Sequence, residues 1–143
     1  MNTECNAISM RGLVVRHGAR SVIDQLDWDV PTGSIVALVG ENGAGKSTLF
    51  DAVTGLIRPS AGQLRVMGLD PMRDGVGLRA RLGYVESEPA FDFDERAGVV
   101  LAFHRGLRPT WNDELACDWT RRLRLPLDRR VRSLSRGERA KLA

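Results

Sequence analysis

Residues 40–48 carry the residue types and the spacing that bind phosphate groups. They fit the pattern G-x-x-x-x-G-K-[ST] and are Gly40, Glu41, Asn42, Gly43, Ala44, Gly45, Lys46, Ser47 and Thr48. An apolar run precedes them and a helix-favouring run follows, which is the strand, loop and helix order that a P-loop requires. The glycines let backbone N–H groups converge on phosphate oxygens. Lys46 can then reach β- and γ-phosphates, and the Ser47 hydroxyl can ligate Mg²⁺, so the segment predicts nucleotide binding.

A glycine-rich turn that contains Lys-Ser by chance is the alternative. Lys46 is one of only 2 lysines among the 21 basic residues of the chain. A basic position that served solubility alone would be expected to be Arg. A site that needs a compact ammonium group explains Lys46 better.

Size and composition are those of one soluble globular domain. The chain has 143 residues, 43% of them hydrophobic and 27% charged, which suffices to bury a core. No apolar run approaches the roughly 18 to 20 residues that span a bilayer, and the polar N-terminus lacks the pattern of a secretory signal. Cys5 and Cys117 have no zinc-type spacing. We therefore expect free thiols and a cytoplasmic location.

Alternating and apolar runs predict the strands. Residues 8–16 and 22–30 are expected to form antiparallel strands joined by a turn, and residues 63–67 a further short strand. The unbroken apolar run at residues 34–39 is expected to be a strand buried on both faces, and residues 82–85 another core strand.

Helical patterns dominate elsewhere. A helix is expected from about Lys46 to Leu56, and a second is marked by recurring apolar residues, which are Val99, Val100, Phe103 and Leu107. A third is expected to begin after Thr110 as its N-cap. Its apolar stripe, which is expected to pack in the core, comprises Trp111, Leu115, Trp119 and Leu123. A last helix is expected to begin near Ser135, with Glu138 completing a capping box.

A second motif lies near the end of the chain. It is close to L-S-G-G-Q and consists of Leu134, Ser135, Arg136, Gly137 and Glu138. With the P-loop upstream, its order and spacing make the chain resemble an ATP-binding cassette (ABC) ATPase domain. The resemblance runs from about Ile8 to Ala143. Residues 109–111 and 134–143 look most like ATPase subunits of bacterial exporters that pair with a separate membrane protein.

The resemblance implies a fold and a set of partners. The fold would be α/β, a P-loop NTPase of the ABC ATPase type with an N-terminal antiparallel β subdomain, a partial parallel core sheet and a helical subdomain. Residues 1–143 would be a single incomplete domain, with the nucleotide-binding core at about 1–90 and the helical subdomain at about 91–143. ATP and Mg²⁺ would lie between the P-loop of one subunit and the signature of the other in a homodimer or heterodimer. A transmembrane permease subunit would be the second partner, at the cytoplasmic face of the membrane, and no nucleic acid is expected.

Two positions depart from the family pattern. His17 stands where family members often have an aromatic residue that stacks on adenine; imidazole stacks more weakly, and a plain turn residue is the alternative. Ser87 stands where a Gln commonly bridges magnesium and the attacking water. Because Ser is too short for that span, Glu88 or a bridging water is the candidate substitute.

The hydrolytic residues of the family would follow Ala143. They are a Walker B Asp, a catalytic Glu and a switch His, and nothing within residues 1–143 obviously replaces them, nor the core strands that accompany them. The resemblance therefore implies an ATP-binding subunit that energises transport when complete and dimeric, whereas residues 1–143 alone would hydrolyse ATP negligibly. One alternative is a non-hydrolysing nucleotide-binding remnant or half of a split domain. Another is a soluble ABC ATPase acting on the ribosome or on nucleic acid, suggested by the arginine-rich residues 121–141.

Overall fold

The chain divides into two compact units, each with its own cluster of buried apolar residues. The computed structural model describes residues 6–86 and 89–143. Residues 1–84 form the first unit and residues 85–143 the second.

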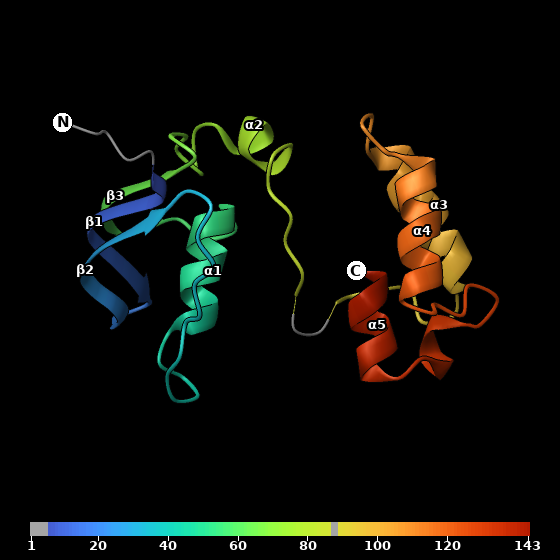
Figure 1. Ribbon diagram of the computed structural model, residues 1–143. Helices are drawn as coiled ribbons and strands as arrows, with labels where there is room; N and C mark the ends of the chain where they lie inside the picture. The colour runs from blue at the N-terminus through green and yellow to red at the C-terminus, as the bar shows by residue number, and fades with distance from the viewer. Residues whose placement is uncertain (1–5, 87–88) are drawn as a thin grey trace. The chain divides into compact units, whose positions relative to one another are not determined.

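A three-stranded antiparallel sheet forms the scaffold of the first unit (Figure 1). β1 (Asn6–His17) lies between β2 (Arg20–Pro31) and β3 (Ala61–Val66). Gly18 closes the β1–β2 hairpin with a φ of 58°, a left-handed conformation that glycine adopts without strain. The sequence prediction of an antiparallel pair followed by a short third strand is confirmed.

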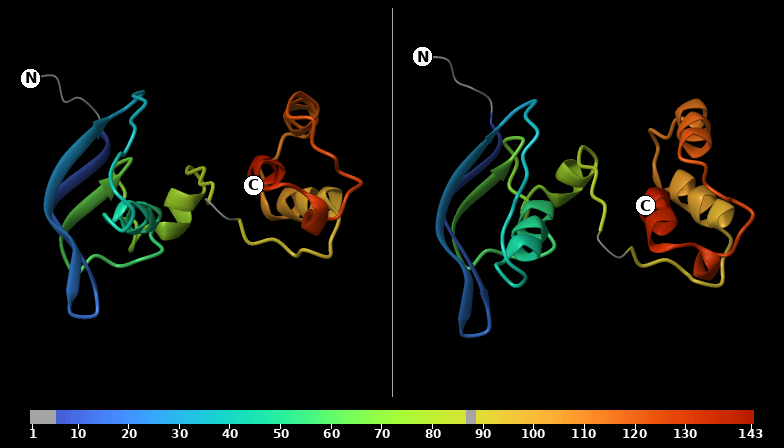
Figure 2. Two further views of the ribbon diagram at one scale, coloured as in Figure 1. Left: turned by 90° about the horizontal axis from the view of Figure 1, so that it is seen from below. Right: turned by 60° about the horizontal axis from the view of Figure 1, so that its bottom comes forward.

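Helix α1 (Lys46–Thr54) lies against one face of the curved sheet (Figure 2). It ends at Gly55, which has a φ of 76° and ends the helix in the left-handed region. A short helix that the sequence did not predict, α2 (Gly75–Arg79), adds Leu78 to the same core. The buried cluster takes its members from the strands and from both helices, and they include Met10, Leu13, Val15, Leu49, Ala52 and Leu78.

The two predicted core strands do not form. Residues 34–39 and 82–85 have no regular secondary structure, and Ile35 and Val39 are 102% and 88% exposed. A buried parallel strand takes its hydrogen bonds from neighbours on both sides and its cover from helices on both faces. Within residues 6–86 and 89–143 the only sheet is the antiparallel one, which leaves these apolar runs without a partner strand.

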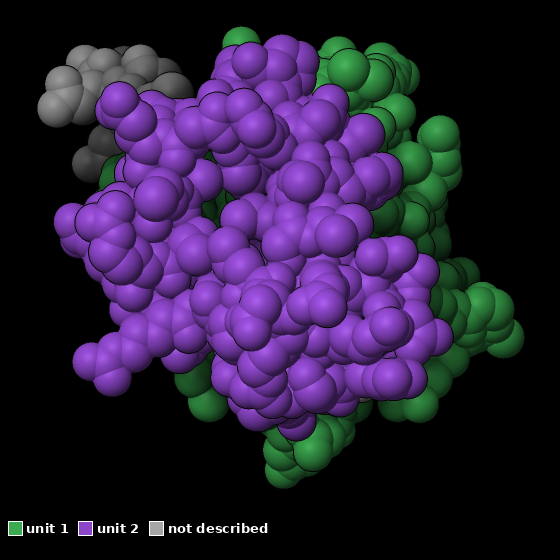
Figure 3. Space-filling view, turned by 90° about the vertical axis from the view of Figure 1, so that its right-hand side faces the viewer, with its two compact units in different colours: residues 1–84 green, residues 85–143 purple. Residues whose placement is uncertain are grey.

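The second unit (purple in Figure 3) is helical. Its elements are α3 (Ala97–Leu107), α4 (Asp113–Arg122), the 3₁₀ turn η1 (Val131–Ser133) and α5 (Arg136–Leu142). Their shared core consists of Ala97, Val100, Val131, Leu134 and Leu142. The helices predicted around Val99 and after Ser135 are confirmed, as is the α/β fold with an antiparallel β subdomain and a helical part.

Backbone hydrogen bonds tie the start of α3 to the loop that precedes α5. Ala97 N–H donates to the Arg129 carbonyl at 3.0 Å, and Val131 N–H donates to the Glu95 carbonyl at 2.9 Å. Gly98 N–H donates to the Leu127 carbonyl at 2.9 Å. Because three bonds join segments some thirty residues apart in sequence, the loop before α5 has a fixed course.

The prediction for α4 was wrong in two respects. Its N-cap is Asn112, whose side-chain oxygen accepts from Leu115 N–H at 2.9 Å, rather than Thr110. Its apolar stripe is not core either, since Leu115 and Trp119 are 55% and 51% exposed. Helical periodicity shows that side chains share a face, but not that another element covers that face. In the described part of the chain no helix is both long and apolar enough to traverse a membrane.

Candidate functional site

The glycine-rich loop at residues 40–48 leads directly into α1, whose N-cap is Gly45. Gly43 and Gly45 have φ values of 82° and 90°, which residues other than glycine rarely adopt. A Cβ atom on Gly45 would lie 3.0 Å from Val22 Cγ1 and 3.1 Å from the Val22 carbonyl oxygen. Gly45 is therefore required twice, by its backbone conformation and by the closeness of the loop to β2.

The loop closes around the ammonium group of Lys46. Lys46 Nζ donates to the carbonyl oxygens of Gly40 and Glu41, both at 2.6 Å. An ammonium has three hydrogens, so one remains for a ligand. The half-buried Lys46 thus holds its positive charge inside the loop rather than extending into solvent.

The start of α1 is left open to an anion. The first N–H groups of a helix have no acceptor within the helix, and neither a side-chain cap nor an acidic residue occurs in the first turn of α1. Ser47, in this turn, is exposed. Positive dipole potential, the Lys46 ammonium and unblocked amides together fit a triphosphate.

A small cavity of about 250 Å³ adjoins the loop. The residues of β2 that line it include Val22 and Ile23, and Ala44 and Lys46 contribute from the loop side. The cavity thus shares Ala44, Gly45 and Lys46 with the predicted phosphate site.

His17 lies at the exposed end of β1, paired with Arg20 across the hairpin. The ladder places Val15 opposite Ile23, next to Val22, which approaches Gly45. The β1–β2 hairpin therefore runs past the loop at residues 40–48 before it reaches His17. Contact between His17 and an adenine ring stays a prediction. Ser87 and Glu88 lie outside the described residues.

Ser135 caps α5 in the way the sequence predicts. The Ser135 hydroxyl accepts from Glu138 N–H at 3.2 Å, and Ser135 N–H donates to Glu138 Oε2 at 2.7 Å, which completes a capping box. Leu134, just before the cap, is 4% exposed and belongs to the core. Gly137 is exposed, and a Cβ atom there would meet no described residue within 4 Å. The contacts within this unit therefore do not explain a glycine at position 137.

The match to known proteins decides the family. The family model described as ABC transporter matches residues 23–143. The chain belongs to the ABC transporter family. It is 36% identical over 137 residues to the zinc import ATP-binding protein ZnuC of Alkalilimnicola ehrlichii, covering 92% of this chain and 47% of that protein. It is 58% identical over 59 residues to the aliphatic sulfonates import ATP-binding protein SsuB 3 of Paraburkholderia xenovorans, covering 41% and 24%.

Solved structures show the same ABC fold. A structure described as the ATP binding subunit of an ABC transporter superposes with a TM-score of 0.81 at 23% identity, covering 95% of this chain and 59% of that one. The chain spans less than half the length of the two relatives named above. The resemblance to an ABC ATP-binding domain is thus confirmed, while the exporter-like character stays a prediction, since both named relatives are import proteins.

The capping box of this ABC chain is expected to respond to pH. The pKa of Glu138 lies below its ordinary value of 4.5, first because Ser135 N–H donates to the carboxylate and also because Arg129 lies close. A pKa that is lower in the folded chain stabilises the fold above the unfolded value, and this contribution disappears as the pH falls through the folded value. We expect the start of α5 to be intact above about pH 4.5 and to loosen below it.

Amide exchange of Glu138 N–H, followed from about pH 3 to 6, would measure this loosening after correction for intrinsic exchange. Glu138→Gln keeps an oxygen acceptor but does not titrate in this range, so its corrected exchange should stay flat. An equal slope in both proteins would contradict the assignment.

The arginine-rich segment of the ABC chain makes contacts within its own unit. Arg122 pairs with Asp118 at 2.7 Å, and Arg132 pairs with Asp94 at 3.0 Å. Arg139 lies over the ring of Phe93 at 5.5 Å. Several arginines of residues 121–141 therefore contribute to contacts within the second unit.

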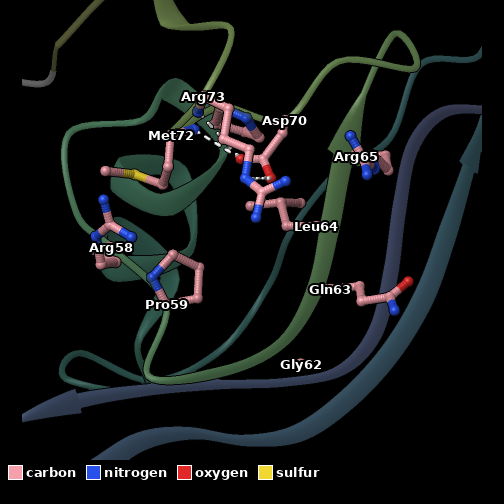
Figure 4. Close-up of a pocket in the computed structure, with 10 residues that line it drawn as sticks. Arg58, Pro59, Gly62, Gln63, Leu64, Arg65, Asp70, Met72 and Arg73 are labelled. Carbon is pink, nitrogen blue, oxygen red and sulfur yellow. Dashed lines mark hydrogen bonds and ion pairs between the residues drawn. The ribbon is translucent and has the colours of Figure 1, made fainter.

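A separate polar cavity of about 360 Å³ lies beside β3 (Figure 4). Its lining includes Arg58, Arg65, Arg73 and Asp70, and it shares no residue with the loop at 40–48. Asp70 Oδ1 accepts from Met72 N–H at 2.9 Å, which is the main reason that the pKa of Asp70 lies below its ordinary value. The carboxylate is therefore occupied in ordering the turn ahead of α2.

Proposed function

We propose that this chain binds Mg-ATP at residues 40–48 as the ATP-binding part of an ABC transporter subunit. The observation that carries the proposal is the Lys46 ammonium, held 2.6 Å from two loop carbonyls at the uncapped start of α1. Such an arrangement suits a multiply charged anion, because it combines a full positive charge with several converging N–H donors.

Each part of the loop has a distinct role in this proposal. Lys46 neutralises the β- and γ-phosphates, and the amides of residues 43–48 hold their oxygens. The Ser47 hydroxyl completes the coordination of Mg²⁺. Among residues 6–86 and 89–143 no cluster of three or more His, Cys, Asp or Glu side chains could hold a metal, so magnesium would bind with the nucleotide. In a complete and dimeric protein, hydrolysis of the bound ATP would supply the free energy for transport.

The turn that carries the L-S-G-G-Q-like motif, residues 133–138 and called the signature turn below, would serve a second subunit. Ser135 and Gly137 are proposed to contact the γ-phosphate held by the partner's P-loop, in a homodimer or heterodimer that works on a transmembrane permease at the cytoplasmic face of the membrane. The free space above Gly137 supports this role, because a glycine that its own unit does not require allows close approach of another molecule.

Residues 1–143 are proposed to bind ATP without hydrolysing it efficiently. We propose that residues 1–143 alone release phosphate only at background rate, because the positions identified here bind and orient nucleotide, and none of them supplies a general base for water.

Calorimetry with ATP, ADP and adenosine tests the central claim. If the loop holds the triphosphate, affinity should fall along that series, with adenosine about 100-fold weaker than ATP. The same samples give the rate of phosphate release. Equal affinity for ATP and adenosine would show that residues 40–48 do not grip phosphate.

A further inference from the structure

The guanidinium of Arg129, a residue that the sequence did not single out, joins two points of the signature turn. Arg129 Nη2 donates to the Ser133 carbonyl, and Nη1 donates to Glu138 Oε1 at 3.5 Å. The main chain of Arg129 is itself fixed, since its carbonyl accepts from Ala97 N–H at 3.0 Å. Arg129 therefore connects the start of α3 with both sides of the Ser135 cap.

Glu138 shares its two carboxylate oxygens between cap and arginine. Oε2 accepts from Ser135 N–H at 2.7 Å, whereas Oε1 faces Arg129. Leu134, between the two serines of the turn, is anchored in the core. Ser135 is thus held from both sides, by a buried side chain before it and by a carboxylate and its arginine after it.

We propose that Arg129 is a positioning residue of the signature turn: it holds Ser135 and the first turn of α5 in the orientation that meets the ATP of a partner subunit. The inference rests on the proposed function. Arg129 also changes the charge of the signature turn. Glu138 places a negative charge on the turn that would face a triphosphate, and like charges repel. Arg129 brings a positive charge to that carboxylate.

The first experiment measures how well the Ser135 cap is formed, from the amide exchange of Glu138 N–H. Arg129→Gln is expected to speed amide exchange of Glu138 N–H about three- to fivefold, the effect of losing an exposed charged contact. Arg122→Gln is the matched control, because it removes an exposed ion pair of 2.7 Å on α4 and should leave this amide unchanged. Unaltered exchange in Arg129→Gln would overturn the inference whatever the chain binds.

The second experiment measures ATP-dependent association between two copies of the chain. ATP-dependent self-association of the chain, followed by sedimentation, is expected to weaken about three- to fivefold in Arg129→Gln and to recover in part in Arg129→Lys, which restores the charge. Affinity of the P-loop for ATP and the midpoint of thermal unfolding should not move, which separates positioning from general destabilisation. If ATP does not make the unmodified chain self-associate, the proposed homodimer fails, and with it the role of Arg129 in that contact. If it associates and Arg129→Gln behaves like Arg122→Gln, only the role of Arg129 fails.

Discussion

Lys46→Ala is expected to weaken Mg-ATP binding by about 10- to 100-fold, the loss of one or two charge-assisted hydrogen bonds. The Lys46 ammonium is expected to contact the phosphates, and it also stabilises the loop, because it donates to the carbonyl oxygens of Gly40 and Glu41 at 2.6 Å. Its removal both deletes a positive charge and frees those carbonyls to turn toward the phosphates, which would repel them. Calorimetric titration of the chain with Mg-ATP measures the change.

Two further variants make the result specific. Lys141→Ala removes the other lysine of the chain, whose Nζ donates to the Leu123 carbonyl at 3.4 Å in the second unit, and should bind ATP normally. Lys46→Arg keeps the charge, but a planar guanidinium is too wide for a loop closed around an ammonium and should not restore binding. Similar losses in both alanine variants would mean that the effect is one of net charge alone.

Gly62→Ala is expected to be the most destabilising glycine substitution in the first unit. Gly62 has a φ of 84°, and a Cβ atom there would lie 2.2 Å from the Gly12 carbonyl oxygen and 2.7 Å from that of Arg11. Since both contacts are with the backbone of β1, relief requires separation of β1 from β3. We expect a loss of about 3 kcal/mol or more in the free energy of unfolding, from strain and overpacking together.

Gly68→Ala separates the two causes. Gly68 has a φ of 78°, but among residues 6–86 and 89–143 nothing would lie within 4 Å of a Cβ atom there. Backbone strain alone should cost about 1 kcal/mol. Urea unfolding of both variants, monitored by circular dichroism, gives the comparison, and equal losses would show that the contact with β1 contributes nothing.

Features that depend on neighbours in sequence could be predicted. The hairpin of β1 and β2 depends on alternation and on Gly18, and the start of α5 depends on Ser135 and Glu138 only three positions apart. The loop at residues 40–48 is of the same kind, because its glycines and Lys46 act within a single turn of chain.

Features that depend on distant parts of the chain could not. Residues 34–39 have the composition of a buried strand, but a strand also needs neighbours, and the described residues provide none. The stripe on α4 has helical spacing, but Leu115 and Trp119 remain half exposed in the part of the chain that the structure describes. Arg129 acquires its contacts only when the loop before α5 folds back on the start of α3. Local sequence therefore determines the β1–β2 turn, the cap of α5 and the phosphate loop, whereas burial and long-range pairing are decided by which surfaces the complete fold brings together.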